Sequence, residues 1–297
     1  MADAARRTTS RQSLARHPGF EDISPEVGQL DEAAFDDALR DDPDETLALL
    51  ADLTGATDAR LRDLARHLAG RVVVDVVRTG TPRRRGIGRL RHAPADRSPG
   101  ELDLDRGLET LATARAHGVA PDLGELHVRE WSRPDLALCL LVDRSGSMGG
   151  ARLATAAVAA AACLWRAPLD TSVVAFGDEA VVLAAQGSGR PPELVVEDLF
   201  RLRGHGPTDL ALALRVARRQ LDRSSAARRI TVLLSDARAT KGGDPVAEAA
   251  ALDELVVLCP AGDSDEAEGL ADDLGARWVE VAGPSDVPAA FADVLGS

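Results

Sequence analysis

The feature that most constrains the fold of this chain is an apolar run that ends at an aspartate. Residues 136–142 are all apolar, and Asp143 follows them directly. A run of this length that ends at turn residues is typical of a strand buried on both faces, as in parallel sheets covered by helices. Open α/β sheets bind their ligands at the carboxyl ends of such strands. The sequence therefore predicts that Asp143 lies at a ligand-binding edge.

The residues after Pro134 alternate between strand and helix patterns. Strands are predicted at 136–142, 172–176, 180–184, 230–235, 255–259 and 278–282, and helices at 151–166, 192–203, 209–222, 245–251, 264–274 and 286–295. The turn residues 177–179 indicate a hairpin. This alternation predicts an α/β fold with a doubly wound, mostly parallel six-stranded sheet and one antiparallel edge strand. We expect this domain to span residues 133–297.

The N-terminal part carries less regular helical patterns. Residues 31–132 are predicted to be mainly helical, with helices at 31–40, 44–53, 57–77 and 103–117 and a short strand or linker at 126–131. The β-branched cluster at 72–74 leaves a strand as the alternative there. Residues 1–30 are polar and Arg-rich, which predicts a disordered tail, with a transit peptide as the alternative. They lack the apolar segment of a secretory signal.

Composition excludes some classes of function. The net charge of −13 argues against a general nucleic-acid binder, which needs an excess of Lys and Arg for phosphate contacts. Cys139, Cys163 and Cys259 lie in apolar runs without metal-binding spacing, which predicts reduced core residues and a cytoplasmic protein. No apolar stretch is long enough to span a bilayer.

A basic segment interrupts the N-terminal region. Residues 82–99 are predicted to form a loop that carries Arg83, Arg84, Arg85, Arg89, Arg91 and Arg97. Three interpretations stay open: a solvated loop, a surface for an acidic protein partner, and a segment that docks onto the acidic helices of this chain. Nucleic acid is disfavoured by the overall charge.

Oxygen-bearing side chains recur at the predicted ligand-binding edge. Ser145 and Ser147 follow Asp143 in the pattern Asp-x-Ser-x-Ser. Thr208 comes after a Gly/Pro loop and before a predicted helix, and Asp236 follows the apolar run at 230–235. Carboxylate and hydroxyl oxygens suit a hard cation such as Mg²⁺. The alternative is that these residues are polar caps on an ordinary α/β fold.

These five residues resemble, in type and order, the metal-ion-dependent adhesion site of von Willebrand factor A (VWA) domains. The resemblance implies a six-stranded VWA fold and a bound Mg²⁺, with Mn²⁺ as the alternative ion. It further implies that Ser145 and Ser147 bind the metal through hydroxyls, that Thr208 binds directly or through water, and that Asp236 acts through water. Such a shell leaves the cation under-neutralised, so a carboxylate from a partner protein can complete it.

The N-terminal half is similar to bacterial VWA proteins of the CoxE-like type. The similarity rests on a helical region, the basic segment at 83–90, the segment at 100–106 and the C-terminal VWA pattern. It implies a non-catalytic adaptor that works with a MoxR-type AAA+ ATPase in metal insertion or protein-complex maturation. The sequence contains no G-x-x-x-x-G-K-[ST] phosphate loop of its own, which agrees with that division of labour.

An enzyme is the alternative. An aspartate after a buried strand is also found in haloacid-dehalogenase-like phosphatases, where the residue equivalent to Asp143 would be the nucleophile. Lys241 and Asp236 would then serve as later motifs. That family has a second aspartate two residues after the first, and this chain has Ser145 there, which removes the general acid.

Overall fold

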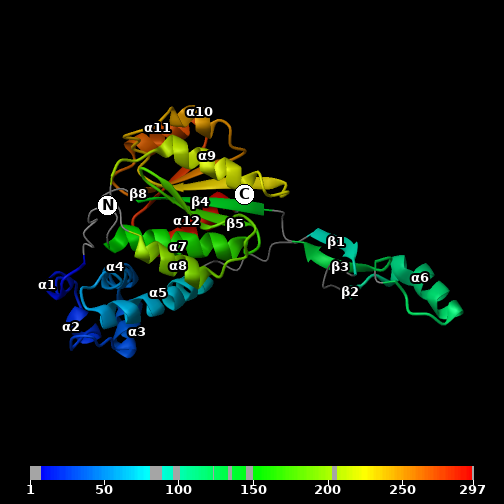
Figure 1. The fold of residues 1–297 in the computed structure, drawn as a ribbon, viewed down its shortest axis with the longest axis horizontal. Coiled ribbons are helices and arrows are strands. Elements are labelled where there is room, and N and C mark those ends of the chain that lie inside the picture. The colour runs from blue at the N-terminus through cyan, green and yellow to red at the C-terminus, as the bar shows by residue number, and fades with distance from the viewer. Residues whose placement is uncertain are drawn as a thin grey trace, which may run out of the picture. The chain divides into compact units, whose positions relative to one another are not determined.

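A computed structural model describes residues 8–80, 89–95, 101–122, 124–132, 136–144, 150–202 and 206–295. The chain divides into two compact units (Figure 1). One unit joins Met1–Pro82 to Leu136–Ser297, and the other comprises Arg83–Asp135. Residues on both sides of the second unit therefore belong to one body, whereas the sequence predicted three consecutive parts, with boundaries after residues 30 and 132.

The first unit is built on a six-stranded sheet. Its strands are β4 (Leu136–Asp143), β5 (Thr171–Phe176), β6 (Ala180–Ala184), β7 (Arg228–Leu234), β8 (Leu255–Pro260) and β9 (Arg277–Val281). Their order is β6-β5-β4-β7-β8-β9, and only β6 runs antiparallel to its neighbour. The apolar run predicted as a buried strand is β4, which lies in the middle of the sheet. The doubly wound α/β fold expected from the sequence is confirmed.

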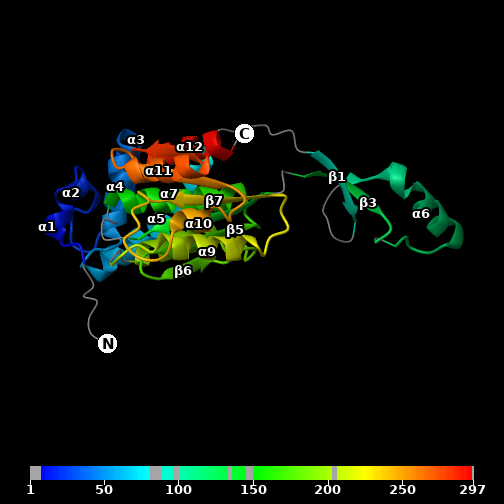
Figure 2. The ribbon, with the colours of Figure 1, turned by 90° about the horizontal axis from the view of Figure 1, so that it is seen from above.

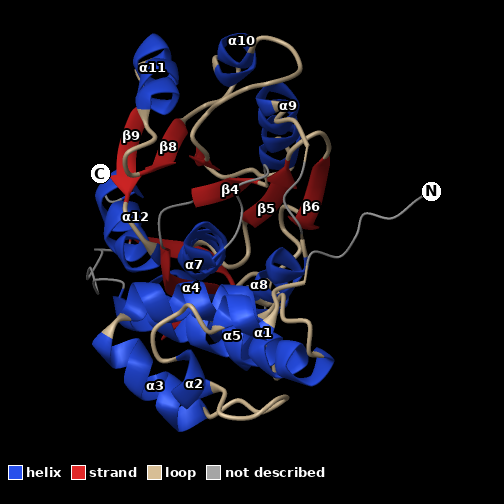
Figure 3. Cartoon of the chain, turned by 90° about the vertical axis from the view of Figure 1, so that its left-hand side faces the viewer, coloured by secondary structure: helices blue, strands red, loops and turns tan. Residues whose placement is uncertain are grey.

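Helices cover both faces of this sheet (Figure 3). On one face lie α9 (Leu210–Leu221), α10 (Pro245–Ala249) and α11 (Asp265–Leu274); on the other lie α7 (Gly150–Arg166), α8 (Pro192–Arg201) and α12 (Val287–Leu295). Each face of the sheet has its own apolar core, because alternate residues of each strand point to opposite sides. Within the described part of the chain, no helix has the length and apolar character needed to cross a bilayer.

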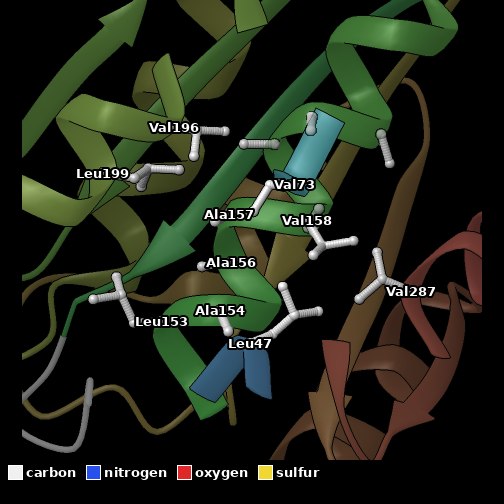
Figure 4. Packing of buried hydrophobic residues seen from close by; sticks show 14 of the residues in the cluster. Leu47, Val73, Leu153, Ala154, Ala156, Ala157, Val158, Val196, Leu199 and Val287 are labelled. Atoms are coloured by element: carbon white, nitrogen blue, oxygen red, sulfur yellow. The ribbon is translucent and has the colours of Figure 1, made fainter. Parts of the chain in front are cut away.

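The N-terminal helices add a third helical layer, which packs over α7 and α8. This layer contains α3 (Glu32–Asp41), α4 (Pro43–Leu53) and α5 (Ala59–Gly80). Leu47 of α4 lies beside Ala154, and Val73 of α5 lies near Ala157 and Val158 (Figure 4). The small alanine side chains of α7 let the helices approach closely. Residues 72–74 are helical, so the alternative of a strand is wrong. Their β-branched side chains are buried in the apolar core, which explains why they are apolar.

The prediction of a disordered tail over residues 1–30 is wrong for the described part of that range. It contains α1 (Arg11–Leu14) and α2 (Phe20–Ile23), and Leu14, Phe20 and Ile23 are fully buried. These apolar residues are too few for a recognisable periodicity, and their helices are stabilised by packing against the helical layer. Residues 1–7 lie outside the described residues.

The second unit is a small α+β body. Strands β1 (Arg89–Pro94), β2 (Glu101–Leu102) and β3 (His127–Ser132) form an antiparallel sheet in the order β1-β3-β2, and α6 (Leu104–His117) follows β2 (Figure 2). The expected loop at 82–99 is therefore wrong at residues 89–94, because β3 offers β1 a partner that the local sequence does not reveal. Residues 81–88 and 96–100 lie outside the described residues.

Candidate metal centre

Asp143 is the last residue of β4, and its side chain is buried. The hydroxyl of Ser235 donates a hydrogen bond to Asp143 Oδ2 at 2.8 Å. Ser235 follows β7 directly, and β4 and β7 are adjacent parallel strands paired at Val142 and Leu234. The carboxyl ends of the two central strands are thus joined through a serine–aspartate hydrogen bond, which fixes the orientation of the Asp143 carboxylate.

Asp236 follows Ser235 and is partly exposed. Its Oδ1 accepts a hydrogen bond from the backbone N–H of Arg238 at 3.0 Å, and the N–H of Ala237 donates to the hydroxyl of Ser235 at 3.0 Å. Ala237 has a positive φ of 61°, which is uncommon for a residue with a side chain. This tight turn buries Ser235 while it leaves the Asp236 carboxylate at the solvent-facing rim.

Thr208 lies in the loop before α9 and is buried. Its backbone N–H donates to the Thr240 hydroxyl at 2.8 Å, and the N–H of Thr240 donates to the Thr208 carbonyl at 3.1 Å. The next residue, Asp209, donates its N–H to the carbonyl of Gly177, which follows β5. Loops after β5 and β7, the two neighbours of β4, therefore hold the segment that carries Thr208.

Asp209 follows Thr208 directly, at the start of the predicted helix over residues 209–222. The structure shows it as the residue that caps α9, because its Oδ1 accepts the N–H of Leu212 at 2.8 Å. Its side chain is nearly buried and packs tightly against Gly242, which has a φ of 100°. A Cβ at position 242 would overlap the Asp209 carboxylate.

Gly242→Ala is therefore expected to destabilise the protein by about 1–3 kcal/mol, because it adds both backbone strain and a steric overlap. Urea denaturation followed by circular dichroism would measure the change. Gly187→Ala is the matched control, since Gly187 also has a positive φ but no atom lies near its Cβ position. An equal loss of stability in the two variants would show that contact with Asp209 contributes nothing.

The five predicted metal ligands are only partly described. Asp143 ends β4, and Thr208 and Asp236 lie in loops that follow β5 and β7, whereas Ser145 and Ser147 lie outside the described residues. Among the described residues, no three His, Cys, Asp or Glu gather as a metal-binding group. A cation held by Asp143, Asp236 and Thr208 would take carboxylate and hydroxyl oxygens. Such an oxygen-only set fits Mg²⁺ or Mn²⁺ and does not suit a zinc ion held by Cys or His.

A cavity of about 220 Å³ opens beside these residues. Asp143 and Asp236 line it together with Arg152 and Thr155 of α7 and with the ends of β8 and β9. The guanidinium of Arg152 lies 3.4 Å from a carboxylate oxygen of Asp263, so a positive charge next to the two acids is itself paired. The candidate metal edge is thus concave and offers room for a side chain from another molecule.

Lys241, which a haloacid-dehalogenase-like phosphatase would need as a later motif, is paired with an acid that is not one of the proposed site residues. The Lys241 ammonium donates a hydrogen bond to Asp178, and this carboxylate raises the pKa of Lys241. The Cys139 thiol is unsuited to act as a nucleophile, because burial raises its pKa to about 12 and keeps it protonated.

Sequence patterns missed three residues that shape this edge. Ser235 looked like the end of an apolar run, although a serine directly before a predicted ligand was a usable signal. Thr240 and Gly242 belong to a loop whose proximity to Thr208 depends on pairings far apart in the chain. Those pairings cannot be inferred from the local sequence.

Comparisons with known proteins give one family match. A family model described as a VWA domain containing CoxE-like protein matches residues 64–277. No curated protein matches the chain.

Three of the similar solved structures differ in how much of each chain aligns. A von Willebrand factor type A protein from Catenulispora acidiphila is 19% identical with a TM-score of 0.44, over 56% of this chain and 43% of its own. The hypothetical protein BatB from Bacteroides thetaiotaomicron is 16% identical with a TM-score of 0.45, over 54% and 97%. Manganese-loaded TRAP protein from Plasmodium vivax is 17% identical with a TM-score of 0.42, over 54% and 73%.

Proposed function

The chain belongs to the family of VWA domain containing CoxE-like proteins, and on this premise we propose that it is a Mg²⁺-dependent protein-binding adaptor. The observation that carries the proposal is that Asp143 and Asp236 line one cavity at the carboxyl ends of β4 and β7. Thr208 lies in a loop held by Gly177 after β5 and by Thr240 after β7. Ser145 and Ser147 complete the proposed ligand set. In this proposal Mg²⁺ is the resident ion, and Mn²⁺ can replace it.

The residues of the proposed site have different roles in binding the ion. Asp143 supplies the carboxylate that contacts the ion, and Ser235 holds that carboxylate in place through its hydroxyl. Thr208 and Asp236 contribute oxygens from the flanking loops. When bound, the cation supplies a positive charge that this ligand set leaves partly uncompensated, and an acidic side chain of a client protein is attracted to it. The concave rim beside Asp236 leaves space for that side chain.

A MoxR-type AAA+ ATPase is the proposed energy source for this adaptor. The chain has no phosphate loop, so ATP hydrolysis must be supplied by another protein if the client is to be remodelled. We propose that such an ATPase docks away from the metal edge, so that the metal edge stays free for the client. The resulting system would serve metal insertion or protein-complex maturation. A cytoplasmic location is part of the proposal, because Cys139, Cys163 and Cys259 are free thiols in the core.

Partner capture is expected to depend on the metal. A tagged protein incubated with lysate of its native host should retain a client in Mg²⁺, release it in EDTA and regain it when Mg²⁺ is restored. The double variant Ser145→Ala with Ser147→Ala should behave in Mg²⁺ like the wild type in EDTA, because it lacks both serine hydroxyl ligands. Retention of the same client in EDTA at moderate salt would mean that the metal edge is not the interface.

The phosphatase alternative gains no support from Lys241, which is paired with Asp178, or from the sequence, which has serine and not aspartate at position 145. A purified-protein assay with a generic phosphate ester would test it separately. Turnover that is lost in Asp143→Asn would favour that enzyme over the adaptor.

A further inference from the structure

The loop after β7 binds both backbone groups of Thr208. The Thr208 N–H donates to the hydroxyl of Thr240 at 2.8 Å. The Thr208 carbonyl accepts the N–H groups of Thr240 at 3.1 Å and of Lys241 at 3.2 Å. The side chain of Thr208 is used differently: the residue is only 4% exposed, yet its hydroxyl makes no hydrogen bond with any residue that the structure describes. Because buried polar groups normally have a partner, this hydroxyl is available for a ligand.

The end of β5 and the turn after it hold the chain beside two of the proposed ligands. The carbonyl of Phe176 accepts the N–H of Arg144 at 2.8 Å, and Arg144 directly follows Asp143. The carbonyl of Gly177 accepts the N–H of Asp209 at 2.9 Å, and Asp209 directly follows the proposed threonine ligand. Two consecutive carbonyls therefore bring the ends of β4 and of the loop before α9 together, through described residues alone.

An ion pair joins the loop after β7 to the turn after β5. The Lys241 ammonium donates to the carboxylate of Asp178, which follows Gly177. Among the 35 lysine and arginine residues of the sequence, Lys241 is the only lysine. Both side chains of the pair are about half exposed, so the pair itself contributes little energy. The hydrogen bonds from Thr240 are therefore the stronger restraint on the Thr208 backbone.

We infer that Thr240 is a positioning residue of the proposed metal site, whose hydroxyl fixes the Thr208 backbone and thereby sets the affinity of the site for Mg²⁺. This inference rests on the proposed function, in which Thr208 is a metal ligand. The physical reason is preorganisation: a ligand that is already held in place loses less conformational entropy when the ion binds. Without the Thr240 hydroxyl, the Thr208 N–H loses its acceptor and the segment is less restrained. Partners that orient metal ligands without touching the metal commonly change metal affinity by about 10–100-fold.

The test is a calorimetric titration of the full chain with MgCl₂ for the wild type and for Thr240→Val, Thr240→Ser and Thr171→Val. We expect Thr240→Val, which keeps the shape of the side chain but lacks its hydroxyl, to weaken Mg²⁺ binding about tenfold. Thr240→Ser should retain most of the affinity, because the serine hydroxyl can still accept the Thr208 N–H. Thr171→Val is the matched control and should bind like the wild type. The Thr171 hydroxyl donates to the carbonyls of Cys163 and Ala167, but it lies at the start of β5, at the opposite edge of the sheet.

Lys241 offers a second measurement that needs no metal. Protein labelled with isotope-enriched lysine gives one lysine backbone amide signal, because the sequence contains a single lysine. The N–H that gives this signal donates to the Thr208 carbonyl. In metal-free protein, we expect this amide to exchange its hydrogen faster in Thr240→Val, and at the wild-type rate in Thr240→Ser and Thr171→Val.

Two results would overturn the inference: wild-type Mg²⁺ affinity in Thr240→Val, or an equal loss of affinity in Thr240→Ser or Thr171→Val, which would show that the hydroxyl at position 240 has no particular role. Asp143→Ala separates this from the proposed function. If the wild type binds Mg²⁺, Asp143→Ala does not, and Thr240→Val binds normally, then only the role of Thr240 is rejected. If the wild type does not bind Mg²⁺, the proposed function is rejected and the role of Thr240 with it.

Discussion

Replacement of Asp143 by alanine is expected to abolish Mg²⁺ and Mn²⁺ binding while the fold persists. Asp143 supplies the carboxylate that would touch the ion, and loss of a direct ligand should exceed the roughly 10–100-fold effect typical of outer partners. The cost to folding should be small. The variant deletes the acceptor of the Ser235 hydroxyl, a loss of about 1 kcal/mol, but it also removes a buried carboxylate.

Calorimetric titration with each metal would measure the affinity, and thermal unfolding by circular dichroism would measure the stability. Asp143→Asn is a stricter variant, because it keeps the shape and an acceptor for Ser235 but lacks the charge. Asp170→Asn is the matched control: Asp170 also accepts a serine hydroxyl, from Ser224, but it lies before β5 at the opposite edge of the sheet. Metal affinity in Asp143→Ala equal to that of the wild type would reject the proposed site.

The α/β part of the fold could be predicted from the sequence, because its apolar strands and its helices alternate in a strong local pattern. The apolar runs that form β4 and β7 are typical of strands buried on both faces. Since the carboxyl ends of parallel strands in one sheet lie at the same edge, the two strand predictions were enough to expect Asp143 and Asp236 at that edge. The adjacency of β4 and β7 is known only from the structure. The expected hairpin at residues 177–179 is confirmed by the antiparallel pairing of β5 and β6.

The rest depended on contacts between distant segments. The burial of Leu14 and Phe20 comes from packing on helices that follow them, and the strand pairing of residues 89–94 comes from β3, more than thirty residues later. The contact of Asp52 with Gly150 spans 98 positions. An exposed acid on an amphipathic helix looks the same in sequence whether it meets water or the start of another helix. Tertiary packing decides such cases.

Removal of the N-terminal helical layer is expected to have the largest effect on the protein. A sequence boundary near Pro134 suggests that the α/β domain could be studied alone after deletion of residues 1–132. In the structure, α4 and α5 bury apolar side chains against α7, α8 and α12 in one continuous core. Each fully buried leucine on these helices contributes roughly 1.5–3 kcal/mol. Loss of Leu47, Leu50, Leu61 and Leu68 alone would then remove about as much as the whole stability of a typical domain, 5–15 kcal/mol.

A fragment that starts at residue 133 should therefore aggregate or lack a cooperative unfolding transition. Excision of the second unit, with residues 83–135 replaced by a flexible Gly/Ser linker, should leave the unfolding transition close to that of the full chain, because Met1–Pro82 packs with Leu136–Ser297. Calorimetric scans of both proteins would decide between these outcomes. A soluble fragment 133–297 with a sharp transition would show that the helical layer is dispensable for folding.

The same pair of proteins also tests where the proposed ATPase docks. The exposed apolar residues on helices of the first unit, such as Leu64, Trp165 and Leu194, lie on three different helices, whereas α6 of the second unit carries both Leu104 and Leu108 exposed. We therefore expect the excised protein to keep its Mg²⁺ affinity and to lose binding of a MoxR-type ATPase added in trans. Full ATPase binding by the excised protein would move the docking surface to the first unit. Binding that also disappears in EDTA would instead place the ATPase on the metal edge, where the proposal puts the client.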